Sequence, residues 1–164
     1  IRTFETYSIY TKRIAKMGAL LTHNSDQAVL TLLKTSDLVE KDFMLLSING
    51  SLRDIIEQVR KSTRNIFPVI DEDGKLQGII LLDNIRQIMF DSDKYDSTKV
   101  SQLMISVEQP VYEEDSMEVV MDKFEKSLSW NLPVISYEGL YKGFVSKSKI
   151  FSAYREQLQK VSHE

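Results

Sequence analysis

The sequence predicts an α+β fold in which two copies of one unit associate with pseudo-twofold symmetry. The first observation is that the 164-residue chain matches itself without a gap when it is shifted by 65 positions, which places Ser51 on Ser116. The second is that each copy combines a helical apolar pattern with two apolar runs joined by a glycine-containing turn. A small sheet with helices on one face leaves its other face uncovered, so we expect the two units to pack sheet to sheet.

The aligned positions include residue types that chance rarely brings into register. Identical residues fall at these pairs: Leu38 and Leu103, Lys61-Ser62 and Lys126-Ser127, Pro68-Val69-Ile70 and Pro133-Val134-Ile135, Gly74 and Gly139, Gly78 and Gly143, and Ile85 and Ile150. We therefore assign residues 36–90 to a first unit, 91–100 to a linker, and 101–164 to a second unit with a C-terminal helix. Residues 1–35 precede the repeat.

Each unit is expected to begin with a short apolar strand, over residues 44–46 and 110–112, followed by an amphipathic helix. Apolar side chains recur at helical spacing on one face of each helix: Leu52, Ile55, Ile56 and Val59 in the first unit, and Met117, Val120, Met121 and Phe124 in the second. Ser51 stands three residues before Asp54, and Asp115 stands three before Glu118. This spacing is typical of a capped helix N-terminus.

A β-hairpin and a second helix are expected to complete each unit. In the first unit, strands over 67–70 and 76–82 flank Asp73-Gly74, where glycine supplies the positive φ that such a turn needs. Residues 137–139 take the same place in the second unit. The closing helices are predicted over 84–90 and 148–161.

Composition narrows the possible functions. The 21 Lys and Arg residues against 24 Asp and Glu residues leave a net charge of −3, so we expect no nucleic-acid partner. The absence of cysteine excludes disulfides, a thiolate nucleophile and a Cys-ligated zinc. No apolar run approaches the roughly 18 residues of a membrane span. The chain begins with Ile1 rather than Met, so we expect it to be a piece of a longer protein.

The hairpin stretches resemble a known family. Residues 67–80, from Phe67-Pro68-Val69-Ile70 through the acidic turn at Gly74 to Gly78-Ile79-Ile80, are similar to the hallmark segment of cystathionine-β-synthase (CBS) domains, and residues 132–146 repeat the pattern. CBS domains occur in tandem pairs, called Bateman modules, that are regulatory attachments to enzymes, channels and transporters. The resemblance implies a regulatory module and not an enzyme.

The segment before the repeat resembles one particular host. Tyr10-Thr11-Lys12-Arg13-Ile14, then Gly18, then residues 22–30, are similar to the segment that joins the last membrane helix of ClC-type chloride channels and transporters to their CBS pair. This resemblance implies a homodimeric module at the cytoplasmic face of the membrane, partnered by the membrane-embedded chloride-transport domain of the same chain. Tyr7, Tyr10, Ile14 and Met17 also recur at helical spacing, so we expect them to lie against the CBS pair.

The alternative is an adenine-nucleotide sensor on another host, such as a magnesium transporter or a metabolic enzyme. CBS pairs that bind adenine nucleotides resemble one another in a Gly-hydrophobic-hydrophobic-Thr/Ser-x-x-Asp pattern whose Asp holds the ribose. Here Asn84 and Lys149 stand at the two Asp positions, and Ser146 keeps the hydroxyl in the second unit only. We therefore expect no resident cofactor, and any adenine nucleotide to bind weakly, at Ser146 and Lys149 facing Leu45 and Leu46.

The remaining sequence motifs give weaker evidence of function. Ser146 and Lys149 also form the Ser-x-x-Lys string of penicillin-recognising enzymes, but its companion motifs are absent. His23 and His163 have no metal-ligand spacing around them, so we expect no metal site. Asp83 is expected to cap the helix that follows it, and Trp130 to serve in packing or in an interface.

Overall fold

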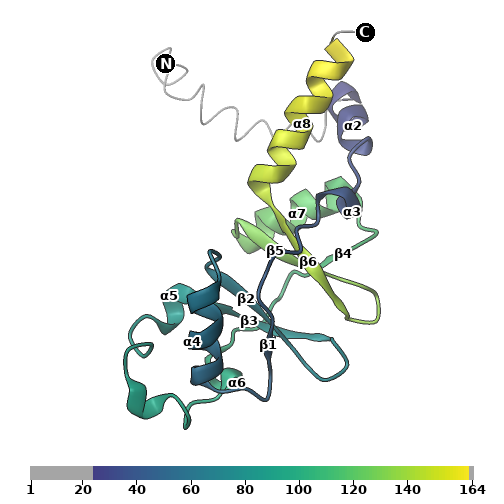
Figure 1. Cartoon of the computed structure of the whole chain (residues 1–164). Coiled ribbons are helices and arrows are strands. Elements are labelled where there is room, and N and C mark those ends of the chain that lie inside the picture. The colour runs from purple at the N-terminus through teal and green to yellow at the C-terminus, as the bar shows by residue number, and fades with distance from the viewer. Residues whose placement is uncertain (1–23, 163–164) are drawn as a thin grey trace.

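The computed structural model describes residues 24–162, and these form two α+β units that follow one another along the chain (Figure 1). Each unit has a three-stranded sheet, in the order β1-β2-β3 in the first and β4-β5-β6 in the second. In each sheet the first strand runs parallel to the second, and the second pairs antiparallel with the third. The expected order of strand, helix, strand, strand and helix is confirmed.

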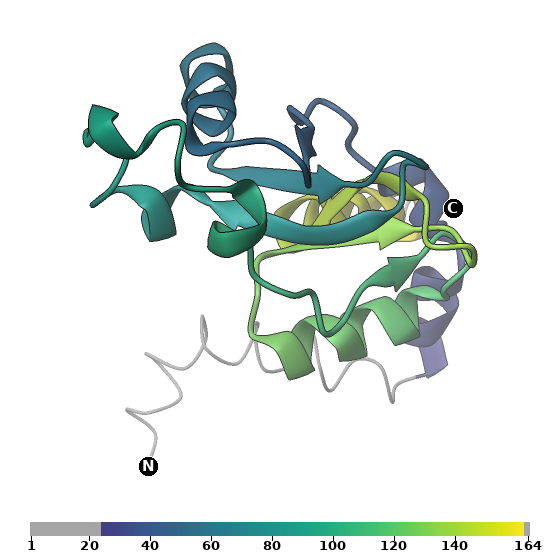
Figure 2. The same ribbon diagram turned by 90° about the horizontal axis from the view of Figure 1, so that it is seen from below.

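The 65-residue repeat extends to the start of every element in the two units. The first unit contains β1 (Leu46–Ser47), α4 (Leu52–Lys61), β2 (Ile66–Ile70), β3 (Leu76–Leu81) and α5 (Leu82–Ile85). The second contains β4 (Val111–Tyr112), α7 (Met117–Ser127), β5 (Asn131–Ile135), β6 (Tyr141–Ser146) and α8 (Lys147–Ser162). Figure 2 shows the strands of both units between α4 on one side and α7 on the other.

Two of the remaining short helices also follow the repeat. The helix α2 (Asn24–Thr31) precedes the first unit and α3 (Thr35–Leu38) lies at its start, while the 3-10 helix η2 (Ser92–Lys94) lies in the linker and α6 (Val100–Leu103) lies at the start of the second unit. The start of α6 follows that of α3 by the same 65 residues. Residues 1–23 lie outside the described part of the chain, and with them the prediction that Tyr7, Tyr10, Ile14 and Met17 contact the pair.

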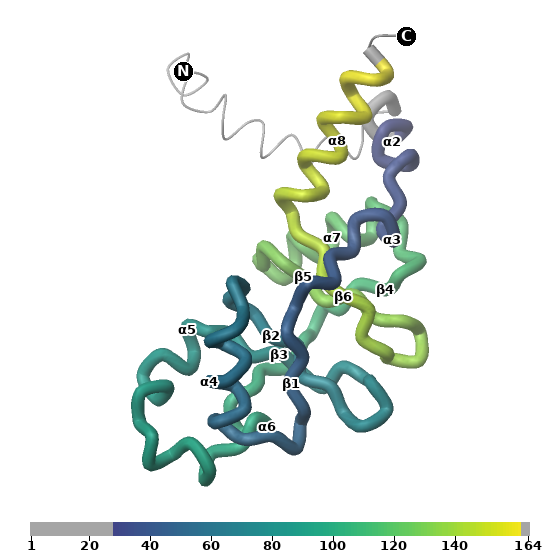
Figure 3. The backbone as a smooth tube through the Cα atoms, in the orientation of Figure 1, coloured from purple at the N-terminus to yellow at the C-terminus, as the bar shows by residue number. Residues whose placement is uncertain are grey.

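The leading helices are exchanged between the units. Leu38 of α3 belongs to the buried core of the second unit, together with Val29, Leu30 and Leu33. Val100 of α6 belongs to the core of the first unit. Figure 3 follows the chain from α3, beside the second unit, to β1 in the first. Each unit therefore buries a helix that the repeat assigns to the other.

Paired backbone segments accompany this exchange. Glu40 forms an antiparallel bridge with Phe144 of β6, and the aligned residue Ile105 forms one with Ile79 of β3. The hairpin tips also meet, because the Leu76 amide donates to the Gly139 carbonyl and the Tyr141 amide donates to the Gly74 carbonyl, both at 3.0 Å. The contacts occur in matched pairs, as the predicted pseudo-twofold symmetry requires.

Some predicted local features are wrong. The first strand is Leu46–Ser47 and not residues 44–46, because only these two residues pair with β2. The second helix of the first unit ends at Ile85 and not at residue 90, because the following residues form tight turns in which the Ile88 amide donates to the Ile85 carbonyl. In the second unit, Ser116 and not Asp115 caps α7, since its hydroxyl accepts from the Val119 amide at 3.3 Å. The predicted cap of α4 is confirmed: the Asp54 carboxylate accepts from the Ser51 amide at 2.8 Å.

Candidate functional site

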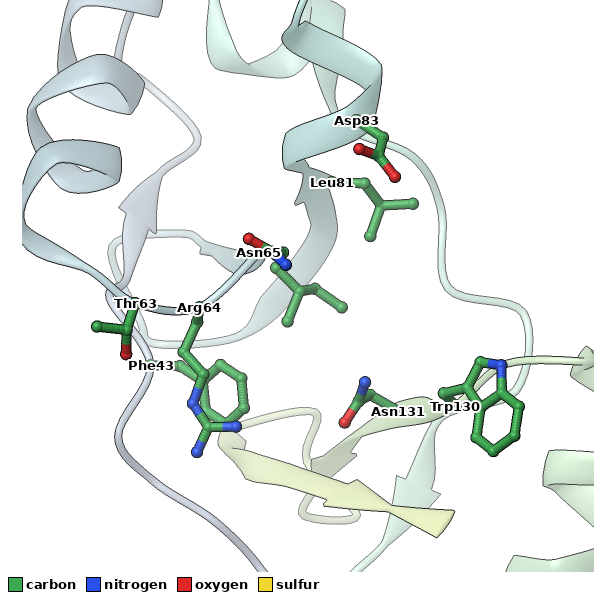
Figure 4. A pocket seen from close by; sticks show the side chains of 9 residues that line it. Phe43, Thr63, Arg64, Asn65, Leu81, Asp83, Trp130 and Asn131 are labelled. Atoms are coloured by element: carbon green, nitrogen blue, oxygen red, sulfur yellow. The ribbon is translucent and has the colours of Figure 1, made fainter. Parts of the chain in front are cut away.

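A cavity of about 550 Å³ opens between the two units. Its lining comes from the segment before β1, the α4–β2 loop, the junction of β3 and α5, and the α7–β5 loop. The lining residues are Phe43, Thr63, Arg64, Asn65, Ile66, Leu81, Asp83, Trp130 and Asn131. Figure 4 shows Phe43 beside Arg64 on the first unit, and Trp130 and Asn131 on the second. Both copies of the repeat thus contribute to one site.

Trp130 gives the cavity an aromatic surface. The residue is 69% exposed, so it is not a packing residue of the core. The Lys147 ammonium lies 5.0 Å from the centroid of its ring, a cation–π distance. A planar group can stack on such a ring, and the nearby cation favours a ligand that carries negative charge.

Arg64 is the charged centre of the cavity. Its Nη2 donates to Glu40 at 2.8 Å and to Asp42 at 2.6 Å, and its guanidinium lies 4.3 Å from the centroid of the Phe43 ring. The hydrogen bonds to Glu40 and Asp42 raise the pKa of Arg64 further above its usual range. The bond to Arg64 also lowers the pKa of Asp42. Arg64 and Asp42 therefore remain charged at neutral pH.

Ser146 and Lys149, which the sequence predicts as ligand contacts, lie where β6 ends and α8 begins. The Ser146 hydroxyl accepts from the Lys149 amide at 3.2 Å and donates to the Glu40 carboxylate at 3.3 Å. Neither residue lines the cavity. The Ser146 hydroxyl, which the sequence predicts as a ligand contact, is therefore bonded to a carboxylate of the protein itself.

The other three predicted site residues, Leu45, Leu46 and Asn84, do not line the cavity either. Leu46 is 2% exposed and belongs to the core of the first unit, where β1 pairs with β2, so its side chain is not open to a ligand. Leu45 is exposed on the neighbouring position, and Asn84 is exposed on α5. Asp83, next to Asn84, does line the cavity. It caps no helix, and its carboxylate accepts from Arg86 at 2.8 Å.

Sequence reasoning missed Glu40 and Arg64. A comparison of the two copies of the repeat could have identified both residues, because Glu40 aligns with the uncharged Ile105 and Arg64 aligns with the uncharged Ser129. A charge present in only one copy cannot be required by the shared fold. Within residues 24–162 no cluster of side chains suited to a metal ion is found, and no helix there is long and apolar enough to span a bilayer.

Two paired α+β units of the same strand order, with one cavity lined by residues of both, define a tandem-repeat module. The family model for the CBS domain matches the chain twice, at residues 36–91 and 100–156. The chain belongs to the CBS-domain family, as a tandem pair.

A relative is found by sequence. Protein MJ1004 of Methanocaldococcus jannaschii, an uncharacterized protein, is 27% identical over 115 residues. These residues cover 69% of this chain and 52% of that protein. The chain thus spans about half the length of this curated relative.

Solved structures share the fold at lower sequence identity. CbpB in complex with c-di-AMP has a TM-score of 0.69 at 16% identity, and the match covers 85% of this chain and 95% of that one. CBSX2 in complex with AMP has a TM-score of 0.63 at 18% identity, with coverages of 75% and 96%. CbpB from Streptococcus agalactiae has a TM-score of 0.65 at 17% identity, with coverages of 85% and 89%.

Proposed function

We propose that this CBS pair is the regulatory module of a ClC-type chloride channel or transporter, placed at the cytoplasmic face of the membrane as a homodimer. The proposal is supported by the resemblance of residues 10–18 and 22–30 to the connector of that family. The observation that carries it is the burial of the last part of this connector. Val29 and Leu30 are 4% and 3% exposed in the core of the second unit.

Such burial offers a route by which the pair can bias a gate. The chain runs from α2 through α3 to Glu40, which pairs with β6 of the second unit. Packed interiors transmit displacement because their compressibility is low. A change in the relative position of the units therefore moves the buried start of the module, and with it the chain that leads to the membrane part.

The test is a chloride-flux measurement on the full-length protein in liposomes. Leu30→Asp places a charge in the core and is expected to change the rate of chloride flux without changing anion selectivity. Leu32→Asp is the matched control, because Leu32 lies on the same segment but is 56% exposed. Equal flux for Leu30→Asp and the unmodified protein would contradict the proposal, as would a reading frame without membrane spans.

A second candidate function is adenine-nucleotide sensing on another host, such as a magnesium transporter or a metabolic enzyme. It is favoured by the cavity with Trp130 on its wall and by the fold shared with CBSX2 and CbpB, which were solved with AMP and c-di-AMP. Asn84 and Lys149 leave no carboxylate at the ribose positions, so binding is expected to be weak.

Trp130 allows a direct test, because it is the chain's one tryptophan. A nucleotide that enters the cavity changes its fluorescence, so titration with AMP, ATP and c-di-AMP measures binding. Weak binding, with dissociation constants above about 100 μM, is the expected result, because losing the hydrogen bonds to one charged group costs roughly 1.5–3 kcal/mol. A low-micromolar constant that is lost in Asn131→Ala would favour the sensor over the channel module.

A further inference from the structure

The two backbone bridges that join the units have different side chains around them. At the bridge between Glu40 and Phe144, Glu40 lies between Arg64 of the first unit and Ser146 of the second. At the bridge between Ile105 and Ile79, the positions aligned with these three residues hold Ile105, Ser129 and Leu81, and none of them is charged. The ionic contacts are therefore not required for such a bridge to form.

Glu40 is held through both its backbone and its side chain. Its amide donates to the Phe144 carbonyl at 2.7 Å, and the Phe144 amide donates to its carbonyl at 2.9 Å. Its side chain is 20% exposed and contacts an Arg64 side chain that is 30% exposed. Charge-assisted bonds at this degree of burial are stronger than those on an open surface. They hold the segment before β1 to the edge of β6.

Arg64 connects this contact to the cavity. It lines the cavity, and its bonds to Glu40 and Asp42 use Nη2 and Nε. A planar guanidinium binds a phosphate through two parallel hydrogen bonds. Arg64 cannot form both of these bonds while its N–H groups donate to two carboxylates. Lys147, beside Trp130, adds a second positive charge near the cavity. An anion in the cavity thus competes with Glu40 and Asp42 for the same cation.

We propose that Glu40, Arg64 and Ser146 form a latch that holds the segment before β1 on β6, and that a phosphate-bearing anion bound in the cavity opens it by drawing Arg64 away from Glu40. The opening step rests on the second proposed function, whereas the latch itself does not. Release of Glu40 frees the segment that leads back to α3 and α2. The latch thereby couples the cavity to the start of the module.

Amide hydrogen exchange tests the latch in the chain of residues 1–164. Glu40→Gln and Arg64→Gln are each expected to raise exchange at the amides of residues 40 and 144 by about tenfold, and to leave the Ile79 and Ile105 amides unchanged. Unchanged exchange at Phe144 in both variants would overturn the latch, as would an equal rise at Ile79 and Ile105.

Arg53→Gln is the matched control for Arg64→Gln. Arg53 donates to Asp96 through two bonds, at 2.7 and 3.0 Å, and its guanidinium lies 5.6 Å from the centroid of the Tyr95 ring. It therefore has the same chemistry as Arg64 at a place that the cavity does not reach. Exchange at Glu40 and Phe144 is expected to stay unchanged in this variant, and a rise equal to that in Arg64→Gln would overturn the latch.

The opening step is tested with inorganic phosphate and AMP as probes. Binding is followed by Trp130 fluorescence, and opening by exchange at Glu40 and Phe144 in the same samples. Both probes are expected to raise exchange at these amides in the unmodified chain and to have no effect in Arg64→Gln. Binding without a rise in exchange overturns the opening step alone. If neither probe binds, both the opening step and the sensor function are wrong. The exchange rates of Glu40→Gln and Arg64→Gln still test the latch in that case.

Discussion

Gly78 and Gly143 hold aligned positions in the two units, and each lies where a neighbouring segment passes too closely for a side chain. A Cβ atom on Gly143 would lie 2.4 Å from the Glu40 carbonyl oxygen and 2.5 Å from a methyl carbon of Val39. A Cβ atom on Gly78 would lie 2.7 Å from the Ile105 carbonyl oxygen. The repeated glycines therefore serve the exchange of segments between the units.

Gly143→Ala is expected to destabilise the pair by about 3 kcal/mol, because the clash adds to the strain of a positive backbone dihedral (φ 145°). Gly139→Ala is the matched control. Its φ of 92° is also positive, but the nearest atom to its Cβ is 4.0 Å away, so it is expected to lose only about 1–2 kcal/mol. Urea unfolding measures both. Equal losses would show that the close approach of Glu40 has no energetic weight.

A partly buried ion pair fixes the start of the second unit. The Lys123 ammonium lies 2.7 Å from the Asp115 carboxylate and 2.8 Å from the Pro110 carbonyl oxygen, and the Lys123 and Asp115 side chains are 16% and 14% exposed. The same ammonium lies 4.7 Å from the centroid of the Tyr112 ring. Asp115 is thereby drawn into this contact and away from the capping role that its sequence position suggested.

Lys123→Met is expected to cost about 3 kcal/mol, because it leaves the Asp115 carboxylate with little solvent and without its cation. Lys126→Met is the matched control: it removes a similar ion pair, of 2.8 Å to Asp122, but these side chains are 63% and 53% exposed. Its expected cost is under about 1 kcal/mol. Chemical denaturation measures the free energy of unfolding of both variants. A Lys123→Met protein as stable as Lys126→Met would contradict the prediction.

At the scale of elements, α2 belongs to the fold of the second unit. It packs beside α8, which has 16 residues where its counterpart α5 has 4. The first unit closes instead with turns and the residues up to Tyr95, which packs partly buried against its core. The two units have the same order of strands and helices, but they differ in the segments that cover their last helix.

The burial of α2 gives a stability prediction separate from the flux experiment. Leu30→Ala is expected to lower the free energy of unfolding by about 3 kcal/mol, since it leaves a cavity in the second core. Leu32→Ala, two residues further along, is expected to change it by less than about 0.5 kcal/mol. Urea titration followed by circular dichroism compares them. A loss at Leu32 as large as that at Leu30 would mean that α2 does not pack in solution as described.

The elements were predictable from the sequence because the fold appears twice. The Pro and Gly positions at 68, 74 and 78, and their copies, place both hairpins to within one or two residues. The predicted helix over 84–90 failed because the residues after Ile85 form tight turns, and the Tyr95 hydroxyl donates to the Met89 carbonyl within them. Glu40, Arg64 and Ser146 meet only after the units pack, so no local pattern in the sequence predicts their contact.

At the scale of the whole molecule, the pair presents apolar side chains on its outer surface. Leu158 and Val161 on α8 are 36% and 50% exposed, and Leu32, just after the adjacent α2, is 56% exposed. Such exposure is common on a surface that contacts another copy or the rest of a larger protein. A homodimer, which the resemblance implies, is one way to cover such side chains.

The chain of residues 1–164 is therefore expected to form a homodimer at high micromolar concentration. Sedimentation velocity over a dilution series measures this, with the dimer giving way to monomer as the protein is diluted. A single 19.0 kDa species throughout the series would rule the dimer out.

The exchange of α3 and α6 constrains how the protein folds as it is synthesised. The first core is incomplete until Val100 has left the ribosome, and the second needs residues 29–38, made long before their partners on α7 and α8. At roughly 5–20 residues per second, the apolar residues of α2 and α3 wait several seconds for the strands they cover. The long sequence separation of these contacts also slows folding. A nascent chain of this kind exposes the apolar residues of α2 and α3 until the strands they cover have been made, and the second core can close only after α8 has been made.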